Sequence, residues 1–244
     1  MSGKFDYYDA IAHVIPGTIA CLLIFFTLDL FQVVIPKLDI GGLGIAGVGF
    51  AVAYTLGHLL QSVASTLEPF YYFVWGGIPS ARLLERKSLH FSDQQRDALI
   101  TDIIGFFQVT EKCPENREGI RNYNQRLFER SMALCNKNKL GRVEAFVAIY
   151  GFHRVLLTTF LLGFLTYATI WVVQIRGWLN LSPEKIPLLK SLVLLTGIGF
   201  AIEIFRTRKR AYHYAREVLW MTSEHIRDSR SAVKKAGSAV SNAE

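Results

Sequence analysis

Residues 141–178 read GRVEAFVAIYGFHRVLLTTFLLGFLTYATIWVVQIRGW, and this stretch decides the fold class. No charged residue lies between Arg154 and Arg176, which leaves 21 consecutive positions dominated by Leu, Phe, Val, Thr and Ile. As a helix these positions would measure about 31 Å, close to the thickness of the hydrocarbon core of a bilayer. The stretch follows a long charged segment, so it predicts the point at which the chain re-enters a membrane.

The composition of the whole chain supports this interpretation. The 244 residues are 51% hydrophobic and 19% charged, with a mean hydropathy of +0.26. The apolar residues are concentrated in four long, nearly uncharged blocks, an arrangement that a soluble domain does not need. We therefore expect an all-α membrane protein. It should have four transmembrane helices in a two-plus-two arrangement, with a helical cytoplasmic domain inserted between the pairs.

The expected boundaries follow changes in composition. An interfacial N-terminus and spans 1 and 2, at about 17–35 and 40–65, occupy residues 1–66, with Pro16 marking the entry to span 1. The helical domain occupies 67–142, and spans 3 and 4 occupy 143–206, with span 4 at about 186–205. Residues 207–244 are expected to form a basic amphipathic helix followed by a disordered tail.

Two helices of the polar segment can be placed from local patterns. Ser92 and Gln95 form a capping-box pattern in front of a helix with Leu99 and Ile103 on one face. A longer helix carries apolar side chains at helical spacing and stops between 136 and 141, and its face consists of Ile120, Tyr123, Leu127, Ser131 and Leu134. We therefore expect a compact helical domain of about 75 residues.

Basic residues give an orientation and a lipid partner. The polar segment has twelve basic residues between Arg82 and Arg142 and ten acidic ones between Glu68 and Glu144, whereas the tail from Arg206 has nine against four. The two short turns between spans hold few basic residues, so the positive-inside rule puts both termini in the cytoplasm. In a bacterium this is the inner membrane. The run Arg206–Arg210 suits anionic headgroups, and the nearly balanced domain argues against nucleic acid as a partner.

Span 2 carries small residues on one face. Gly49, Ala53 and Gly57 stand four residues apart, and such a face lets a second helix approach closely in lipid. We interpret these residues as a helix-packing surface and expect the protein to form a homo-oligomer through it.

Several ionisable side chains near the cytoplasmic ends of the spans are expected to form one polar layer. Arg154 and Glu203 lie at similar depth on antiparallel spans, so they are candidates for an ion pair. His153 is adjacent and His58 lies near the same end of span 2. The layer is interpreted either as a gate or switch coupled to the cytoplasmic domain, or as interfacial anchoring with a structural ion pair.

Asp29 is the deepest charge in the first span. One interpretation is a carboxylate that lines a pore or binds a proton. The other is a helix that ends early and leaves Asp29 in the outer headgroup zone. The sequence leaves both open.

The chain has no motif of an enzyme. We find no P-loop, dinucleotide-binding glycine pattern, HExxH or pair of cysteines at zinc spacing, so no catalytic residue, cofactor or metal is predicted. Three cysteines, Cys21, Cys113 and Cys135, are too few for a disulfide framework and are expected to be free thiols. The first ten residues lack the pattern of a cleaved signal peptide.

The N-terminal run FDYYDAIAHVIPG, at residues 5–17, resembles the opening of small uncharacterised bacterial membrane proteins, some of which are linked to antiviral defence. The resemblance transfers no site residue, and it implies a membrane effector or a membrane-anchored subunit. The leading hypothesis is a non-enzymatic oligomer that couples its cytoplasmic domain to the bilayer and changes membrane permeability. The alternatives are a passive scaffold or regulatory subunit that binds a cytosolic protein, and a small ion channel or transporter.

Overall fold

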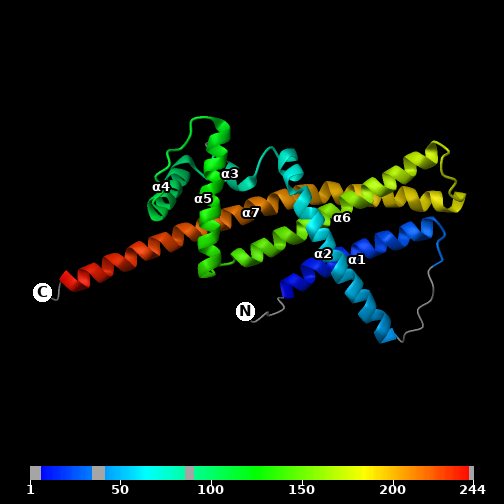
Figure 1. Cartoon of the computed structure of the whole chain (residues 1–244), viewed down its shortest axis with the longest axis horizontal. Coiled ribbons are helices and arrows are strands. Elements are labelled where there is room, and N and C mark those ends of the chain that lie inside the picture. The colour runs from blue at the N-terminus through cyan, green and yellow to red at the C-terminus, as the bar shows by residue number, and fades with distance from the viewer. Residues whose placement is uncertain (1–6, 35–41, 86–90, 242–244) are drawn as a thin grey trace. The chain divides into compact units, whose positions relative to one another are not determined.

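A computed structural model describes residues 7–34, 42–85 and 91–241, and the side chains of 12–34, 42–85 and 91–232. Within these ranges the chain is helical and contains no strand, which confirms the all-α class. The elements are α1 (Tyr7–Leu30), α2 (Gly42–Val74), α3 (Pro79–Leu83), α4 (Asp93–Phe107), α5 (Arg117–Asn138), α6 (Val143–Ile175), the short 3₁₀-helix η1 (Pro183–Lys185) and α7 (Ile186–Ser241) (Figure 1). The predicted turn between spans 1 and 2 lies outside the described residues.

Four of these helices are long and apolar enough to cross a membrane. The apolar segments lie in α1, in α2, in α6 and in the first part of α7, as the sequence predicts. Their boundaries differ from the prediction in two helices: α1 ends at Leu30 rather than near residue 35, and α2 continues past residue 65 to Val74. Pro16 lies inside α1 rather than at its start, and the helix continues from Tyr7 through it to Leu30.

The chain divides into two compact units. Unit 1 comprises Met1–Phe70 and Ala148–Thr207, and unit 2 comprises Tyr71–Val147 and Arg208–Glu244. The chain therefore passes between the units three times, and α2, α6 and α7 each contribute residues to both. Unit 2 is larger than the predicted domain 67–142, because the second part of α7 belongs to it.

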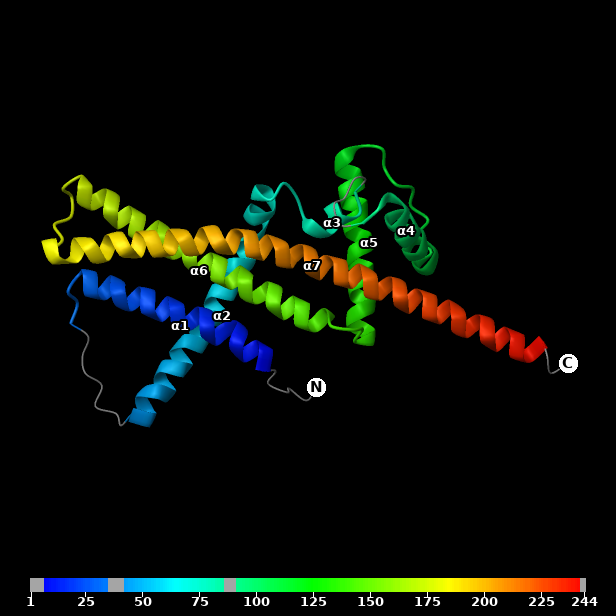
Figure 2. The same ribbon diagram turned by 180° about the vertical axis from the view of Figure 1, so that it is seen from behind.

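In unit 1, α1 lies alongside α6 and the first part of α7, whereas α2 crosses them obliquely in both views (Figures 1 and 2). Glycines allow the closest approaches. A Cβ on Gly17 would overlap the backbone of Ala53, and a Cβ on Gly199 of α7 would lie 2.6 Å from the ring of Phe160 on α6. At the far end of the unit Leu30, Tyr167, Leu189 and Leu192 form a buried cluster.

Unit 2 has its own apolar core. Ile103 of α4, Leu127 of α5 and Leu219 and Ile226 of α7 are buried together in it. The predicted capping box is present: Ser92 accepts a hydrogen bond from the backbone of Gln95, whose side chain accepts one from the N–H of Ser92. These contacts confirm the helical character predicted for the polar segment.

Helix α7 overturns one prediction. The basic run after Phe205 does not interrupt this helix, which has 56 residues in all and ends at Ser241, so it includes most of the tail that was expected to be disordered. The predicted amphipathic face is present, since Ala215, Leu219, Thr222 and Ile226 are buried in unit 2. The tail contains several alanines and lysines, which favour helix, so its low hydrophobicity does not by itself prevent helix formation.

Candidate functional site

An ion pair connects α2 and α6 within unit 1. Nη1 of Arg154 donates to Oε2 of Glu68 at 2.7 Å, and the hydroxyl of Tyr150 donates to the other carboxylate oxygen at 2.6 Å. Nη2 of Arg154 also lies 3.2 Å from the Ser65 hydroxyl. Side chains of Arg154 and Glu68 are largely buried. The carboxylate thus fixes α6 to the last turns of α2 through two strong hydrogen bonds.

A second contact connects α6 and α7. Nδ1 of His153 lies 2.8 Å from Oε2 of Glu203, and the two side chains are only 7% and 6% exposed. The Thr207 hydroxyl donates to the His153 carbonyl at 3.1 Å, and Arg206 approaches Glu203 at 3.7 Å. We call these two contacts, made by Arg154, Glu68, His153 and Glu203, the ion-pair layer.

The predicted ion pair between Arg154 and Glu203 is wrong. Arg154 binds Glu68 instead, and Glu203 binds His153. The reason is the helical phase: consecutive residues point about 100° apart, so His153 faces α7 while Arg154 faces α2. Glu68 was missed because the sequence placed the end of span 2 at about residue 65, whereas α2 continues to Val74.

The ion-pair layer lies close in the chain to all three passages between the units. Glu68 is two residues before the first passage, His153 follows the second by five residues, and Glu203 precedes the third by four. The three helices that enter unit 2 are therefore fixed to one another within one or two turns of their points of exit from unit 1.

His58 lies on a different contact. Its ring stacks on that of His13 from α1, with centroids 3.9 Å apart, and Tyr54 packs edge-on against both rings. This aromatic cluster joins α1 to α2. The prediction that His58 belongs to the same layer as Arg154 is not supported by any described contact between them.

Asp29 pairs with Lys185 at the opposite ends of the helices. Nζ of Lys185 donates to both carboxylate oxygens at 2.8 Å, and the Asp29 side chain is 44% exposed. Asp29 stands in the last turn of α1, next to the connection between α6 and α7. This placement favours the interpretation in which the helix ends early and Asp29 lies outside the apolar region.

The small-residue face of α2 is occupied in part by α1. A Cβ on Gly57 would overlap the carbonyl of His13, and Ala53 is the residue that Gly17 approaches. A Cβ on Gly49, by contrast, would meet nothing within 4 Å. The predicted close approach of a second helix is therefore present at Ala53 and Gly57, but the helix is α1 of the same chain.

The remaining predicted groups have simple surroundings. Arg206, Arg208 and Lys209 are exposed and Arg210 is half-buried, all within α7. Among the described residues no group of three His, Cys, Asp or Glu side chains is arranged to hold a metal ion. The three cysteines are free thiols, as expected.

Comparison with known proteins gives no match to a family model, a curated protein or a solved structure. The resemblance of the N-terminal run to defence-linked membrane proteins therefore stays a prediction.

Proposed function

We propose that this protein couples a cytoplasmic helical unit to the bilayer, without catalysis, by moving α6 and α7. Unit 2 would receive a signal in the cytoplasm, and the spans in unit 1 would respond. The observation that carries the proposal is the ion-pair layer: it fixes α2, α6 and α7 to one another beside every point at which the chain passes between the units.

Continuous helices support the mechanical part of the proposal. Neither α6 nor α7 is interrupted between the units, so a rotation or shift of the part in unit 2 has a direct covalent route into unit 1. A coupling element needs two discrete arrangements to switch between. Contacts that consecutive residues of α6 make with two different helices are suited to this, because a turn of α6 by about 100° would carry one of the two side chains from its present helix to the other.

The proposed response is a change in membrane permeability through an assembly of several copies. In unit 1 Arg154 is paired with Glu68 and His153 with Glu203 near one end of the helices, and Asp29 is paired with Lys185 near the other. These positions favour a shared pathway between copies over a channel through one chain. The orientation, with both termini in the bacterial cytoplasm, rests on the distribution of basic residues.

Membrane-potential measurements during controlled expression in bacteria test the proposal. We expect expression of the native protein to depolarise the cells. In Glu68→Gln and Glu203→Gln, the amount of protein at which depolarisation begins should change by at least about tenfold, because each change removes about 1.4 kcal/mol or more of a charged hydrogen bond. Lys190→Gln, on an exposed side chain outside the ion-pair layer, is the matched control.

Two results would overturn the proposal. Expression without any depolarisation, in the presence and absence of phage infection, would leave a passive scaffold. Depolarisation that is identical in the variants and the control, at equal amounts of protein in the membrane, would show that the ion-pair layer has only a structural role.

A further inference from the structure

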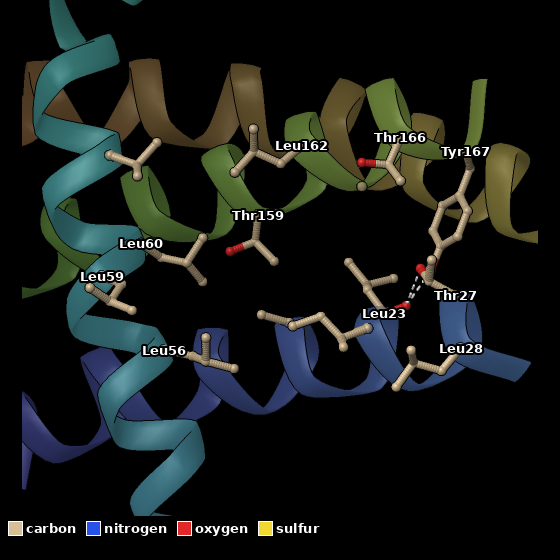
Figure 3. A pocket seen from close by; sticks show the side chains of 14 residues that line it. Leu23, Thr27, Leu28, Leu56, Leu59, Leu60, Thr159, Leu162, Thr166 and Tyr167 are labelled. Carbon is tan, nitrogen blue, oxygen red and sulfur yellow. Dashed lines mark hydrogen bonds between the residues drawn. The ribbon is translucent and has the colours of Figure 1, made fainter. Parts of the chain in front are cut away.

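An apolar pocket lies in unit 1 between α1, α2 and α6 (Figure 3). Its volume of about 380 Å³ falls in the range of small-ligand pockets, about 300–1,000 Å³. The three walls are formed by Leu23, Ile24 and Leu28 of α1, Leu56, Leu59, Leu60 and Val63 of α2, and Leu162 and Thr166 of α6. Unit 1 alone provides every residue of the lining.

The hydroxyl groups in the lining are mostly committed elsewhere. Tyr167 donates to the carbonyl of Leu23 at 2.6 Å, and Thr27 donates to the same carbonyl at 2.8 Å (Figure 3). Thr159 donates to the Val155 carbonyl at 2.9 Å. These hydroxyl groups bond to backbone carbonyls of the helices that form the walls. The side chains therefore present methyl and ring carbons to the cavity. The pocket thus suits a ligand with little or no polar surface.

The dimensions of the pocket match one lipid chain. Along α6 the lining extends from Thr159 to Tyr167, which is about 12 Å of helix, and one leaflet of a bilayer has a hydrocarbon depth of about 15 Å. Arg154 and Ser65 lie just beyond the Thr159 and Val63 end of the lining, so a polar group stands where the chain would leave the pocket. An apolar groove with a polar end is complementary to an amphiphile.

The lining is unsuitable for a helix of a second copy. Helices approach one another closely in lipid through small residues, but most of the lining consists of larger branched side chains such as Leu23, Leu59 and Leu162. Gly163, one of the few small residues in the lining, is already approached by Leu23 and Thr196. An acyl chain can fit between branched side chains, whereas such side chains keep the backbone of a second helix at a distance.

We propose that this pocket binds one acyl chain of a membrane phospholipid, held between α1, α2 and α6. The proposal requires only that the spans lie in a bilayer, and it is independent of any coupling function. The side chains that line an empty cavity lack dispersion contacts on one side, and a bound acyl chain would supply them. The acyl chain would also fill the space between α1 and α2 next to Leu59, Leu60 and Val63.

Photo-cross-linking tests the proposal on the full chain in vesicles. The probe is phosphatidylglycerol with a diazirine in the middle of one acyl chain, and adducts are located by peptide mass spectrometry. We expect the lining segments 23–28, 56–63 and 159–167 to be labelled at least about fivefold more than the exposed Leu194–Leu195 face, a ratio equivalent to about 1 kcal/mol.

Filling the pocket should remove this excess. Leu162→Trp and Leu59→Trp change partly exposed side chains on two walls, and both should reduce the labelling to that of the Leu194–Leu195 face. Leu165→Trp and Val52→Trp, exposed on the same two helices but outside the lining, should leave it unchanged. Equal labelling of all exposed apolar faces would overturn the proposal. So would disulfides between copies carrying Leu162→Cys in a cysteine-free background, since a second chain would then occupy the pocket.

Discussion

His153 and Glu203 are joined by a hydrogen bond of 2.8 Å between two side chains that are almost fully buried. Removing one partner leaves the buried polar atom of the other without its hydrogen bond, which costs about 1–3 kcal/mol. We expect Glu203→Ala to lower the free energy of unfolding in detergent by about this amount. Arg206→Gln, whose side chain is 58% exposed, should lower it by less than about 0.5 kcal/mol. Equal effects would contradict the assignment.

The contact between α1 and α2 gives a prediction with a matched control on one helix. A Cβ on Gly57 would overlap the His13 carbonyl, and backbone cannot move aside as a side chain can. Gly57→Ala should therefore cost about 1–3 kcal/mol in thermal unfolding measurements. Gly49→Ala adds a Cβ in open space and should be neutral or slightly stabilising. The opposite order would mean that α2 packs through Gly49 instead.

Asp29 and Lys185 form a partly exposed pair, so its contribution should be small. Asp29→Asn is expected to change the free energy of unfolding by less than about 1 kcal/mol. Any ion flux through reconstituted protein should persist at its original rate in this variant. Loss of flux in Asp29→Asn, with Lys185→Gln unaffected, would restore the interpretation of Asp29 as a pore carboxylate.

Cysteine labelling tests the core of unit 2. Cys135 is buried, and this burial raises the pKa of its thiol, while a hydrogen bond with Thr222 partly opposes the shift. Since the thiolate is the reactive form, maleimide should modify the exposed Cys113 on the order of 100-fold faster at pH 7.5. Comparable rates in the folded protein would show that α5 and α7 separate readily.

The raised pKa of Cys135 also fixes the sign of a pH dependence. The folded thiol loses its proton at higher pH than the unfolded thiol, whose pKa is about 8.5. Its contribution to stability is therefore complete below that pH and is lost as the pH rises through the folded value. Urea unfolding between pH 7 and 9.5 should show a decline in the native protein that is smaller in Cys135→Ala. A stability that rises with pH through this thiol would contradict the burial.

Much of the fold could be predicted from the sequence. The four apolar segments follow from charge-free length, which is a one-dimensional property of the chain. The start of α4 at Asp93 follows from Ser92 and Gln95, because a capping box is a local interaction over three residues. Long, strongly patterned elements of this kind are determined locally.

The partners in the ion-pair layer could not be predicted in the same way. Which of two consecutive residues faces which helix depends on the rotation of α6 about its axis. Because α6 is apolar on all sides, its sequence does not indicate that angle. The choice of Glu68 over Glu203 for Arg154 also required the end of α2, which continues past its apolar part to Val74. The apolar pocket is likewise invisible in the sequence, since it results from the oblique crossing of α2.

The unbroken length of α7 has a consequence for how this chain tolerates change. Its 56 residues correspond to about 84 Å of helix. The side chains that pack in unit 1 and those that pack in unit 2 are therefore carried by one unbroken helix. Inserting a single residue near Thr207 would turn everything beyond it by about 100° and misalign Leu219 and Ile226 with the core of unit 2. An insertion in the connection at residues 176–182 would change the register of neither α6 nor α7. Lineages of this protein should therefore vary in length at that connection and keep the residue count between Glu203 and Ile226 constant.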